Sequence, residues 1–304
     1  MNFEITILGS SSATPIYQRH PSAQVLNIHE RFFLVDCGEG TQMQLNRYKI
    51  KFARIHHIFI SHLHGDHYFG LMGLLSSMHL QGRTDGMHLY CPKALKEIID
   101  IQLRHSDTVL RYELVYHYTD AVSSKIIFED DDISVETIIL NHRIACTGFL
   151  FREKPKKRKL IREKLAQYNV PREQYNSIKS GKDFVNDKGI VIPNEQLTGD
   201  PKPPCSYAYC SDTMYDERIL SIIRGVDLLY HESTFLEEKA ERAKETFHTT
   251  AKQAGIMARK AEVKRLIIGH FSSRYKDLYP LLEEAKLEFE NTTLAIEGDK
   301  FVIE

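Results

Sequence analysis

The sequence predicts an α/β fold, in which short strands and helices alternate along a chain of 304 residues. β-rich runs alternate with stretches of helical length over most of the chain, which is typical of sheets covered by helices. Histidine and aspartate side chains follow the carboxyl ends of several of these runs, where open sheets carry their reactive groups. The length suffices for one large domain with a sizeable core.

The first half of the chain carries β-rich runs bounded by turn residues and by two predicted helices. Strands are expected over residues 3–8, 32–36, 55–61, 87–91 and 133–140. Helices are expected over residues 40–49 and 93–103, the second directly after Pro92. The strand over 55–61 stops at a cluster of histidines, which makes that strand end the first candidate for a functional site.

The last hundred residues repeat this alternation. Strands are expected over residues 207–211, 226–230, 265–269 and 293–296, and helices over 251–261 and 277–289. Thr249 or Thr250 is expected to cap the first of these helices. The predicted strands place potential ligands just beyond their ends, namely His62, His142, Asp212, His231 and His270.

Residues 152–204 interrupt the pattern. Residues 152–164 hold eight Lys and Arg against two Glu, a local charge of +6 in a chain whose net charge is −1. A helix is expected over 156–168, and the glycines and prolines beyond it are typical of an extended region. We interpret 152–204 as an insertion into a single domain spanning 1–304. The basic stretch suits contacts with RNA phosphates, and a solubilising charged helix is the alternative.

Composition excludes several other classes of protein. The five cysteines are widely spaced with no C-x-x-C pair, which favours reduced thiols in a cytoplasmic protein over a disulfide framework or a zinc ribbon. The amino terminus does not read as a signal peptide. The longest apolar runs fall far below the ~20 residues of a membrane helix, so no membrane association is expected.

Residues 62–67, with the sequence His-Leu-His-Gly-Asp-His, form the strongest local motif. In an extended stretch, His62 and His64 project to the same side and can bind one ion. Gly65 allows a sharp turn that directs Asp66 and His67 to a second position. Imidazoles and carboxylates suit Zn²⁺ or, less tightly, Mn²⁺ or Fe²⁺. A solvated loop without metal is disfavoured, because the motif ends a buried strand and contains no Lys or Arg.

This loop cannot close a metal site alone, so other strand ends must supply ligands. The candidates are His142, Asp212 and His270. Asp212 is suited to bridge two cations, because a carboxylate has two oxygens. Two cations held close together are the arrangement for in-line cleavage of a phosphodiester.

The chain resembles the metallo-β-lactamase superfamily and, within it, most closely the ribonuclease Z family of tRNA 3′-processing endonucleases. The resemblance spans essentially the whole chain. Its motifs are residues 8–10, 35–42, 60–67, 211–213, 231–235, 247–250 and 270–275. The loop identifies only the superfamily, whereas the motifs at His231 and His248 together with the basic insertion are more specific.

The resemblance implies a four-layer αββα sandwich with a protruding flexible arm formed by residues 152–204. It implies two zinc ions per subunit. The implied ligands are His62, His64 and His142 for one zinc, and Asp66, His67 and His270 for the other, with Asp212 bridging. Asp66 matches the proton acceptor of the family and His248 a proton donor to the leaving oxygen, with Glu232 orienting His248.

The implied substrate is precursor tRNA, cut after the discriminator nucleotide to leave a 3′-hydroxyl and a 5′-phosphate trailer, by a cytoplasmic homodimer. The residues expected to contact this substrate are Ser273, Arg274, Arg19, Lys156, Lys157, Arg158 and Lys159. Near Arg19, Tyr17 and His20 replace the Lys and Asn with which the family senses the tRNA 3′ end, so the response to CCA is left open. A small-molecule hydrolase and a non-catalytic RNA-binding module are the alternative functions.

Overall fold

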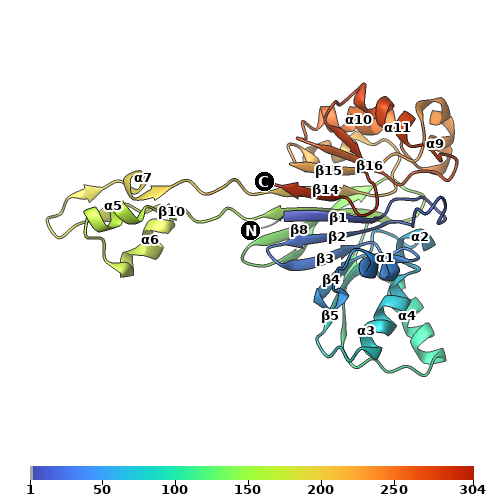
Figure 1. The fold of residues 1–304 in the computed structure, drawn as a ribbon, viewed down its shortest axis with the longest axis horizontal. Coiled ribbons are helices and arrows are strands. Elements are labelled where there is room, and N and C mark those ends of the chain that lie inside the picture. Colours follow the sequence, from blue (N-terminus) through green and yellow to red (C-terminus); the bar gives the residue numbers. More distant parts are fainter. Residues whose placement is uncertain (1–2) are drawn as a thin grey trace. The chain divides into compact units, whose positions relative to one another are not determined.

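The computed structural model describes residues 3–304 and divides into two compact units. Unit 1 comprises Met1–Phe128, Val135–Phe151 and Cys205–Glu304, and unit 2 comprises Glu129–Ser134 and Arg152–Pro204. Figure 1 shows the ribbon coloured along the sequence. The residues expected to form an insertion make up the second stretch of unit 2.

The first sheet of unit 1 has the strand order β18-β1-β2-β3-β4-β5-β6. Its strands are β1 (Phe3–Gly9), β2 (Ala23–Ile28), β3 (Arg31–Val35), β4 (Ile55–Phe59), β5 (Met87–Pro92), β6 (Leu114–Thr119) and β18 (Lys300–Ile303). Strands β3 to β6 run parallel, whereas β18, β1, β2 and β3 pair antiparallel. The parallel strands therefore end at one edge of the sheet.

The second sheet has the order β17-β16-β15-β14-β9-β8-β7. Its strands are β7 (Ile126–Glu129), β8 (Ile133–Leu140), β9 (Cys146–Glu153), β14 (Ser206–Cys210), β15 (Leu228–Glu232), β16 (Leu266–Gly269) and β17 (Thr292–Leu294). Strands β14 to β17 are parallel, so their carboxyl ends also share one edge.

Buried aromatic rings join the inner faces of the two sheets. Phe59 of β4 lies edge-on against Phe149 and Phe151 of β9, with ring centroids 5.3 Å apart in both pairs. Phe33 of β3 makes a similar contact with Phe151, at 5.8 Å. Large aromatic side chains fill the ~10 Å between packed sheets and bury much apolar area.

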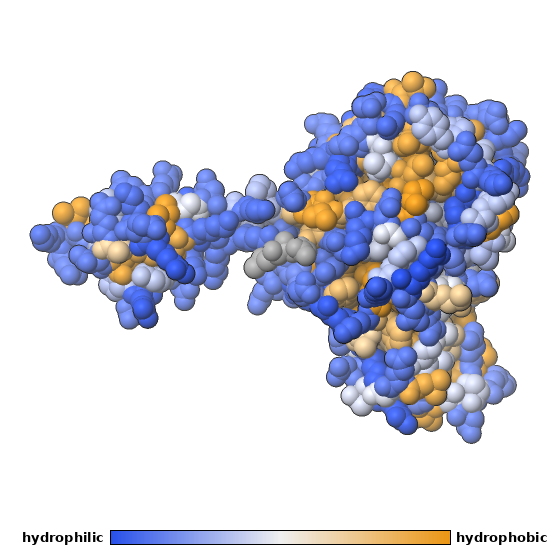
Figure 2. Space-filling view, in the orientation of Figure 1, coloured by the Kyte–Doolittle hydropathy of each residue, from blue (hydrophilic) through white to orange (hydrophobic). Residues whose placement is uncertain are grey.

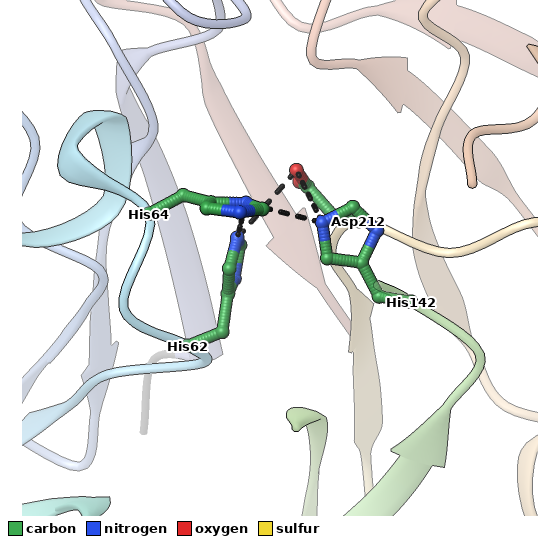
Figure 3. A group of neighbouring side chains, drawn as sticks. All are labelled: His62, His64, His142 and Asp212. Atoms are coloured by element: carbon green, nitrogen blue, oxygen red, sulfur yellow. Dashed lines mark hydrogen bonds and ion pairs between the residues drawn. The ribbon is translucent and has the colours of Figure 1, made fainter. Parts of the chain in front are cut away.

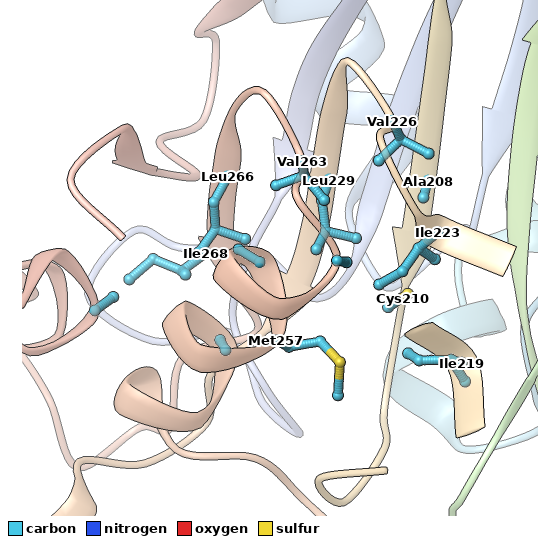
Figure 4. Close-up of a cluster of buried hydrophobic side chains, with 14 of the residues drawn as sticks. Ala208, Cys210, Ile219, Ile223, Val226, Leu229, Met257, Val263, Leu266 and Ile268 are labelled. Atoms are coloured by element: carbon cyan, nitrogen blue, oxygen red, sulfur yellow. The ribbon is translucent and has the colours of Figure 1, made fainter. Parts of the chain in front are cut away.

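Helices cover the outer faces of both sheets. Against the first sheet pack α1 (Thr41–Arg47), α3 (Leu71–Leu80) and α4 (Ala94–His105). Against the second pack α8 (Leu220–Ile223), α10 (Ala251–Lys260) and α11 (Tyr279–Lys286); Figure 4 shows Met257 of α10 near Leu229, Leu266 and Ile268. The order helix, sheet, sheet, helix confirms the predicted αββα architecture.

Short elements connect these layers. They are α2 (Gly65–Tyr68), α9 (Ala240–Thr246), and the 3-10 turns η1 (Phe52–Arg54), η3 (Glu217–Ile219) and η4 (Glu237–Lys239). In unit 1, the elements that were not predicted are the strands β2, β6, β7, β9 and β18 and the helices α2, α3, α8 and α9. No helix within residues 3–304 combines the length and the apolar character needed to span a bilayer.

Two of the expected local structures are wrong. The helix expected over 156–168 is reduced to α5 (Arg162–Gln167), because β10 (Lys159–Leu160) pairs with β13 (Thr198–Gly199) and takes the preceding residues into extended backbone. His231 does not follow its strand. It lies inside β15, fully buried, with its Nδ1 hydrogen-bonded to the backbone oxygen of Glu232.

Unit 2 has a small core of its own. The buried residues of this core are Leu165, Val170, Ile178, Phe184, Ile192 and Leu197. Around it lie α5, η2 (Arg172–Gln174), α6 (Tyr175–Lys179), β11 (Phe184–Val185), β12 (Val191–Ile192) and α7 (Asn194–Leu197). The buried Asn194 amide donates to the backbone oxygens of Ile178 and Lys182, which ties α7 to the turn after α6. In Figure 2 the visible face of unit 2 is mostly hydrophilic.

Candidate metal centre

The histidine loop begins where β4 ends and turns into α2 at Gly65. His64 is the extended N-cap of α2, with φ −75° and ψ 143°. A Cβ on Gly65 would lie 2.1 Å from Cε2 of the Phe69 ring, so this ring packs directly on the glycine backbone. A larger residue at position 65 would therefore have to displace the exposed Phe69 ring.

The first group of potential ligands combines this loop with two distant strand ends (Figure 3). His64 Nδ1 lies 3.0 Å from His62 Nε2 and 3.1 Å from His142 Nε2. The Oδ2 atom of Asp212 lies 3.6 Å from His62 Nε2 and 3.8 Å from His142 Nε2. Three imidazoles and one carboxylate thus point at one position.

The second group consists of Asp66, His67 and His270. The Oδ2 atom of Asp66 lies 3.5 Å from His67 Nε2 and 3.4 Å from His270 Nε2. Asp212 faces this group with its other oxygen, since Oδ1 lies 3.2 Å from His67 Nε2 and 3.1 Å from His270 Nε2. The structure therefore brings all seven predicted metal ligands together, with Asp212 between the two groups.

The chemistry of His67 shows that these residues fit cations. Its Nδ1 donates to Asp36 at 2.8 Å, which leaves a lone pair on Nε2 facing Asp66 and Asp212. This buried Nε2 has no hydrogen-bond partner within residues 3–304. Burial lowers the pKa of His67, but the carboxylates of Asp212, Asp66 and Asp36 outweigh it and raise the pKa well above the usual value, so Nε2 takes up a proton where no cation faces it. The cluster therefore requires positive charge, and its imidazoles and carboxylates are ligands that Zn²⁺ accepts.

Three of the imidazoles also contact the protein through Nδ1, the ring nitrogen that faces away from the cluster. His142 Nδ1 donates to the backbone oxygen of Phe247 at 3.0 Å. His270 Nδ1 lies 2.9 Å from Thr234 Oγ1, and His62 Nδ1 lies 3.0 Å from Ser61 Oγ. Such contacts set the tautomer and the orientation of a ligating histidine.

Asp36 is a supporting residue that the sequence did not single out. Besides His67, its carboxylate accepts hydrogen bonds from the Ser61 amide at 2.8 Å and from the Tyr209 hydroxyl at 2.7 Å. It is fully buried and its φ of +55° places it in the left-handed region. The available signals were its position as the last residue of the predicted strand over 32–36 and its place in the motif over 35–42.

His248, which is half-buried, pairs with the buried Glu232. His248 Nδ1 lies 2.8 Å from Glu232 Oε1, and Glu232 is 0% exposed. The Glu232 carboxylate also accepts from the Thr213 amide at 3.1 Å and from the Thr234 hydroxyl at 2.7 Å. Burial lowers the pKa of His248, but the charge of Glu232 outweighs it and raises the pKa to about 9. The imidazole is thus held in its protonated form at neutral pH.

A pocket of about 620 Å³ opens over both ligand groups. His248 lines it, as do Phe69, Arg143 and Arg242, which were not predicted as site residues. Asp66, at its floor, accepts a hydrogen bond from the Ala13 amide at 2.8 Å. Arg143 adjoins His142 in sequence, whereas nothing in the sequence around Arg242 pointed to this pocket.

Three predicted substrate-binding residues do not line this pocket in the described part of the chain. The guanidinium of Arg19 donates to the backbone oxygens of Tyr275, at 2.6 Å, and Lys276, at 3.4 Å. Arg274 is exposed, with its guanidinium carbon 5.6 Å from the centre of the Phe235 ring. Ser273 is half-buried. Arg19 therefore joins two loops of unit 1.

The predicted cations of unit 2 fall into two pairs. Lys156 and Arg158 are half-buried and form ion pairs with Glu153, at 2.8 Å, and Asp200, at 2.7 Å. Lys157 and Lys159 are exposed and line a groove of about 1010 Å³ within unit 2. The other cations along this groove are Arg158, Arg162, Arg172 and Lys179.

The fold and the site together define a metallo-β-lactamase-fold hydrolase whose His/Asp cluster suits a divalent metal. The fold is shared with the metallo-β-lactamase fold protein YhfI from Bacillus subtilis, at a TM-score of 0.70 and 16% identity over 100% of both chains. It is also shared with the short form of human tRNase Z (ELAC1), at a TM-score of 0.70 and 26% identity over 98% of both chains.

Sequence comparison gives the family. The chain is 48% identical to Ribonuclease Z of Bacteroides fragilis over 97% of both sequences, and 50% identical to Ribonuclease Z of Cytophaga hutchinsonii over 100% of this chain and 97% of the relative. The family model described as Anti-Pycsar protein Apyc1 matches residues 3–154. The chain belongs to the ribonuclease Z family and is an endoribonuclease.

Proposed function

We propose that the chain matures tRNA by cutting precursor tRNA after the discriminator nucleotide, with two zinc ions, to leave a 3′-hydroxyl and a 5′-phosphate trailer. The observation that carries this proposal is the convergence of seven ligand side chains beneath one pocket in a member of the ribonuclease Z family. The human protein with the same fold is a tRNase Z.

In this proposal His62, His64 and His142 would hold one zinc, and Asp66, His67 and His270 would hold the other. Asp212 lies near enough to both groups to serve each of them. When bound, a pair of zinc ions activates water and neutralises charge on the scissile phosphate.

Two side chains of the protein move the protons. Asp66 accepts the proton of the attacking water while the Ala13 amide holds its carboxylate. His248 protonates the departing 3′-oxygen of the ribose. Since its Nδ1 contacts Glu232, the donated proton sits on Nε2. Glu232 stabilises the imidazolium until that transfer, which is the role of a positioning residue.

Unit 2 supplies a binding surface for the body of the tRNA. Six cations along one groove suit the phosphates of a folded RNA, which proteins recognise by shape. A cytoplasmic homodimer completes the proposal, and light scattering of the purified chain measures its oligomeric state.

The decisive experiment is cleavage of matched precursor tRNAs, with and without CCA, mapped to the nucleotide. The wild-type chain should cut after the discriminator, and the CCA pair shows whether Tyr17 and His20 alter rejection of mature ends. Cleavage elsewhere, or none, contradicts the proposal. Elemental analysis should find two zinc per chain, and less than one in a folded sample would favour a non-catalytic RNA-binding module.

Asp66→Ala should abolish cleavage, because the variant loses both the proton acceptor and a ligand. Asp131→Ala, at an exposed aspartate outside the pocket, is the control and should cleave as the wild type does. Near wild-type cleavage by Asp66→Ala in the presence of excess zinc would refute this mechanism.

A small-molecule phosphodiesterase is the second candidate. The segment matched by the family model, residues 3–154, contains the histidine loop and His142 and ends before most of unit 2, so it holds much of the metal cluster without the basic groove. Deleting 152–204 should cripple tRNA cleavage and spare a small phosphodiester if unit 2 serves tRNA alone. Equal loss on both substrates would contradict a binding role for unit 2.

A further inference from the structure

Phe69 is a large apolar side chain left exposed beside the metal cluster. It is 66% exposed, whereas the ligands His62, His67, His142 and His270 around the pocket are buried or half-buried. It lies at the carboxyl end of α2 and lines the pocket together with Asp66 and His248. Its exposure leaves the ring open to a ligand in the pocket.

The ring of Phe69 is held in place by its own loop. It packs on the backbone of Gly65, where a Cβ would lie 2.1 Å from Cε2, and it meets the Tyr68 ring edge-on at 5.1 Å. The ring is thus supported by the same turn that carries Asp66 and His67. An aromatic surface held in this way costs little conformational entropy when a second ring stacks on it.

Cations line the same pocket. Arg143 Nη2 lies 3.1 Å from His64 Nε2, and Arg242 Nη1 lies 3.2 Å from Glu245 on the same helix. Both arginines line the pocket with Phe69. An aromatic ring and guanidinium groups beside a site for phosphate chemistry are the side chains that bind single-stranded nucleotides, by stacking on bases and pairing with phosphates.

We propose that Phe69 is a stacking platform for a nucleobase next to the scissile phosphate, so that the pocket holds an unpaired nucleotide rather than the phosphate alone. This inference rests on the proposed cleavage of precursor tRNA. Stacking uses the face of a base, which all four bases share, so the platform would accept different nucleotides at the cut. Phe69 would act on substrate affinity rather than on the chemical step.

The first test compares Phe69 variants on precursor tRNA. Phe69→Ala should raise KM about tenfold with little change in kcat, because stacking is lost equally in the bound substrate and the transition state. Phe69→Tyr and Phe69→Trp should restore KM. Phe69→Leu, which keeps an apolar side chain over Gly65, should remain defective. Zinc content and the thermal midpoint of each variant show whether the loop is intact.

Tyr279→Ala is the matched control, because Tyr279 is 60% exposed, aromatic and outside the pocket lining. It should leave KM unchanged. An unchanged KM in Phe69→Ala, or full recovery by Phe69→Leu, would overturn the stacking role.

The second test removes the base from the substrate. Two precursors carry an abasic nucleotide, one at the discriminator and one at the first trailer position. If Phe69 stacks on one of these bases, that abasic precursor should lose about tenfold in kcat/KM with the wild type and nothing further with Phe69→Ala. If the loss in kcat/KM from the abasic nucleotide and the loss from Phe69→Ala add fully for both precursors, the inference is contradicted.

These outcomes are separate from the proposed function itself. If the wild type fails to cut unmodified precursor tRNA, the function is wrong. If the wild type cuts but the losses add fully, only the stacking platform is wrong.

Discussion

At the residue scale, the metal centre depends on contacts that hold each ligand from behind. Asp36 accepts four hydrogen bonds, from His67 Nδ1, the Ser61 amide and hydroxyl, and the Tyr209 hydroxyl. Because it binds Nδ1, it keeps the lone pair of His67 on Nε2, toward the cluster. A carboxylate behind a ligating histidine also makes that ligand more basic.

Asp36→Asn should therefore weaken binding of the divalent metal, measured with zinc, by about 10- to 100-fold, because the amide cannot supply the same charge behind His67. Competition with a chelator measures this affinity. Asp107→Asn is the control, since Asp107 is exposed and has a similar left-handed backbone, with φ +49° against +55°. Equal zinc affinity in wild type and Asp36→Asn would show that Asp36 does not tune the ligand.

Glu232→Gln tests the pair of Glu232 and His248. Glutamine keeps the shape but removes the charge that raises the pKa of His248 to about 9, and burial alone lowers that pKa. The imidazole should then be largely neutral at pH 7, and kcat should fall by about 10- to 100-fold with KM retained. Single-turnover cleavage measures this, with Glu288→Gln on the surface of unit 1 as the control. An unchanged kcat would remove Glu232 from the mechanism.

At the scale of elements, the ends of strands and the starts of helices place the functional side chains. His270 follows β16, the histidine loop follows β4, and His248 lies just before α10. Thr250 caps α10 by accepting from the Gln253 amide at 3.2 Å, while the Gln253 side chain accepts from the Thr250 amide at 3.1 Å. This capping box fixes where the helix begins and hence the chain direction beside His248.

Thr250→Ala should lower the free energy of unfolding by about 1 kcal/mol, because the N-cap acceptor is lost. Thr250→Ser should retain most of the free energy of unfolding that the N-cap contributes, because serine keeps the hydroxyl acceptor. The denaturant midpoint measures the change, with Lys252→Ala in the same helix as the control, since its pairing with Glu237 spans 3.9 Å at the surface. Equal midpoints for all three variants would show that the cap contributes nothing to stability.

At the scale of the whole molecule, the net charge of −1 conceals a strong segregation. The +6 of residues 152–164 leaves an excess of acidic residues in the remainder of the chain, part of it in the metal cluster. RNA binding to a basic surface releases counterions and weakens as salt rises. If unit 2 captures tRNA as proposed, that capture should depend on salt more steeply than the chemical step in unit 1.

The double variant Lys157→Gln/Lys159→Gln should raise KM and reduce the slope of log KM against log salt by about 2, one for each lost phosphate contact, with kcat unchanged. These two lysines are exposed in the groove, whereas Lys156 is paired with Glu153. Lys182→Gln/Lys188→Gln, exposed in unit 2 but outside the groove, is the control. Identical slopes for both pairs would show that binding follows net charge rather than the groove.

The sequence by itself determined the α/β alternation and the identity of the candidate ligands. Both depend on residues close together in the sequence. The strand and helix periods extend over a few residues, and residues 62–67 alone contain four potential ligands. The resemblance carried this further to the family, which the comparisons confirm. The position of His231, by contrast, was predicted wrongly: it lies inside β15, not after it. The end of a strand depends on pairing with neighbours distant in the sequence, here β14 and β16, and the local pattern does not contain that pairing.

Only the tertiary structure decided what surrounds the ligands. Asp212 was predicted as a bridge, but its place between the two groups depends on β4 and β14, which belong to different sheets. No local pattern encodes how the ends of those sheets meet. The same holds for Asp36 behind His67, for Arg242 from α9 at the pocket, and for Arg19 bound to carbonyls more than 250 residues away. Such contacts follow from the packing of the whole chain, whereas residue types and spacing follow from the sequence alone.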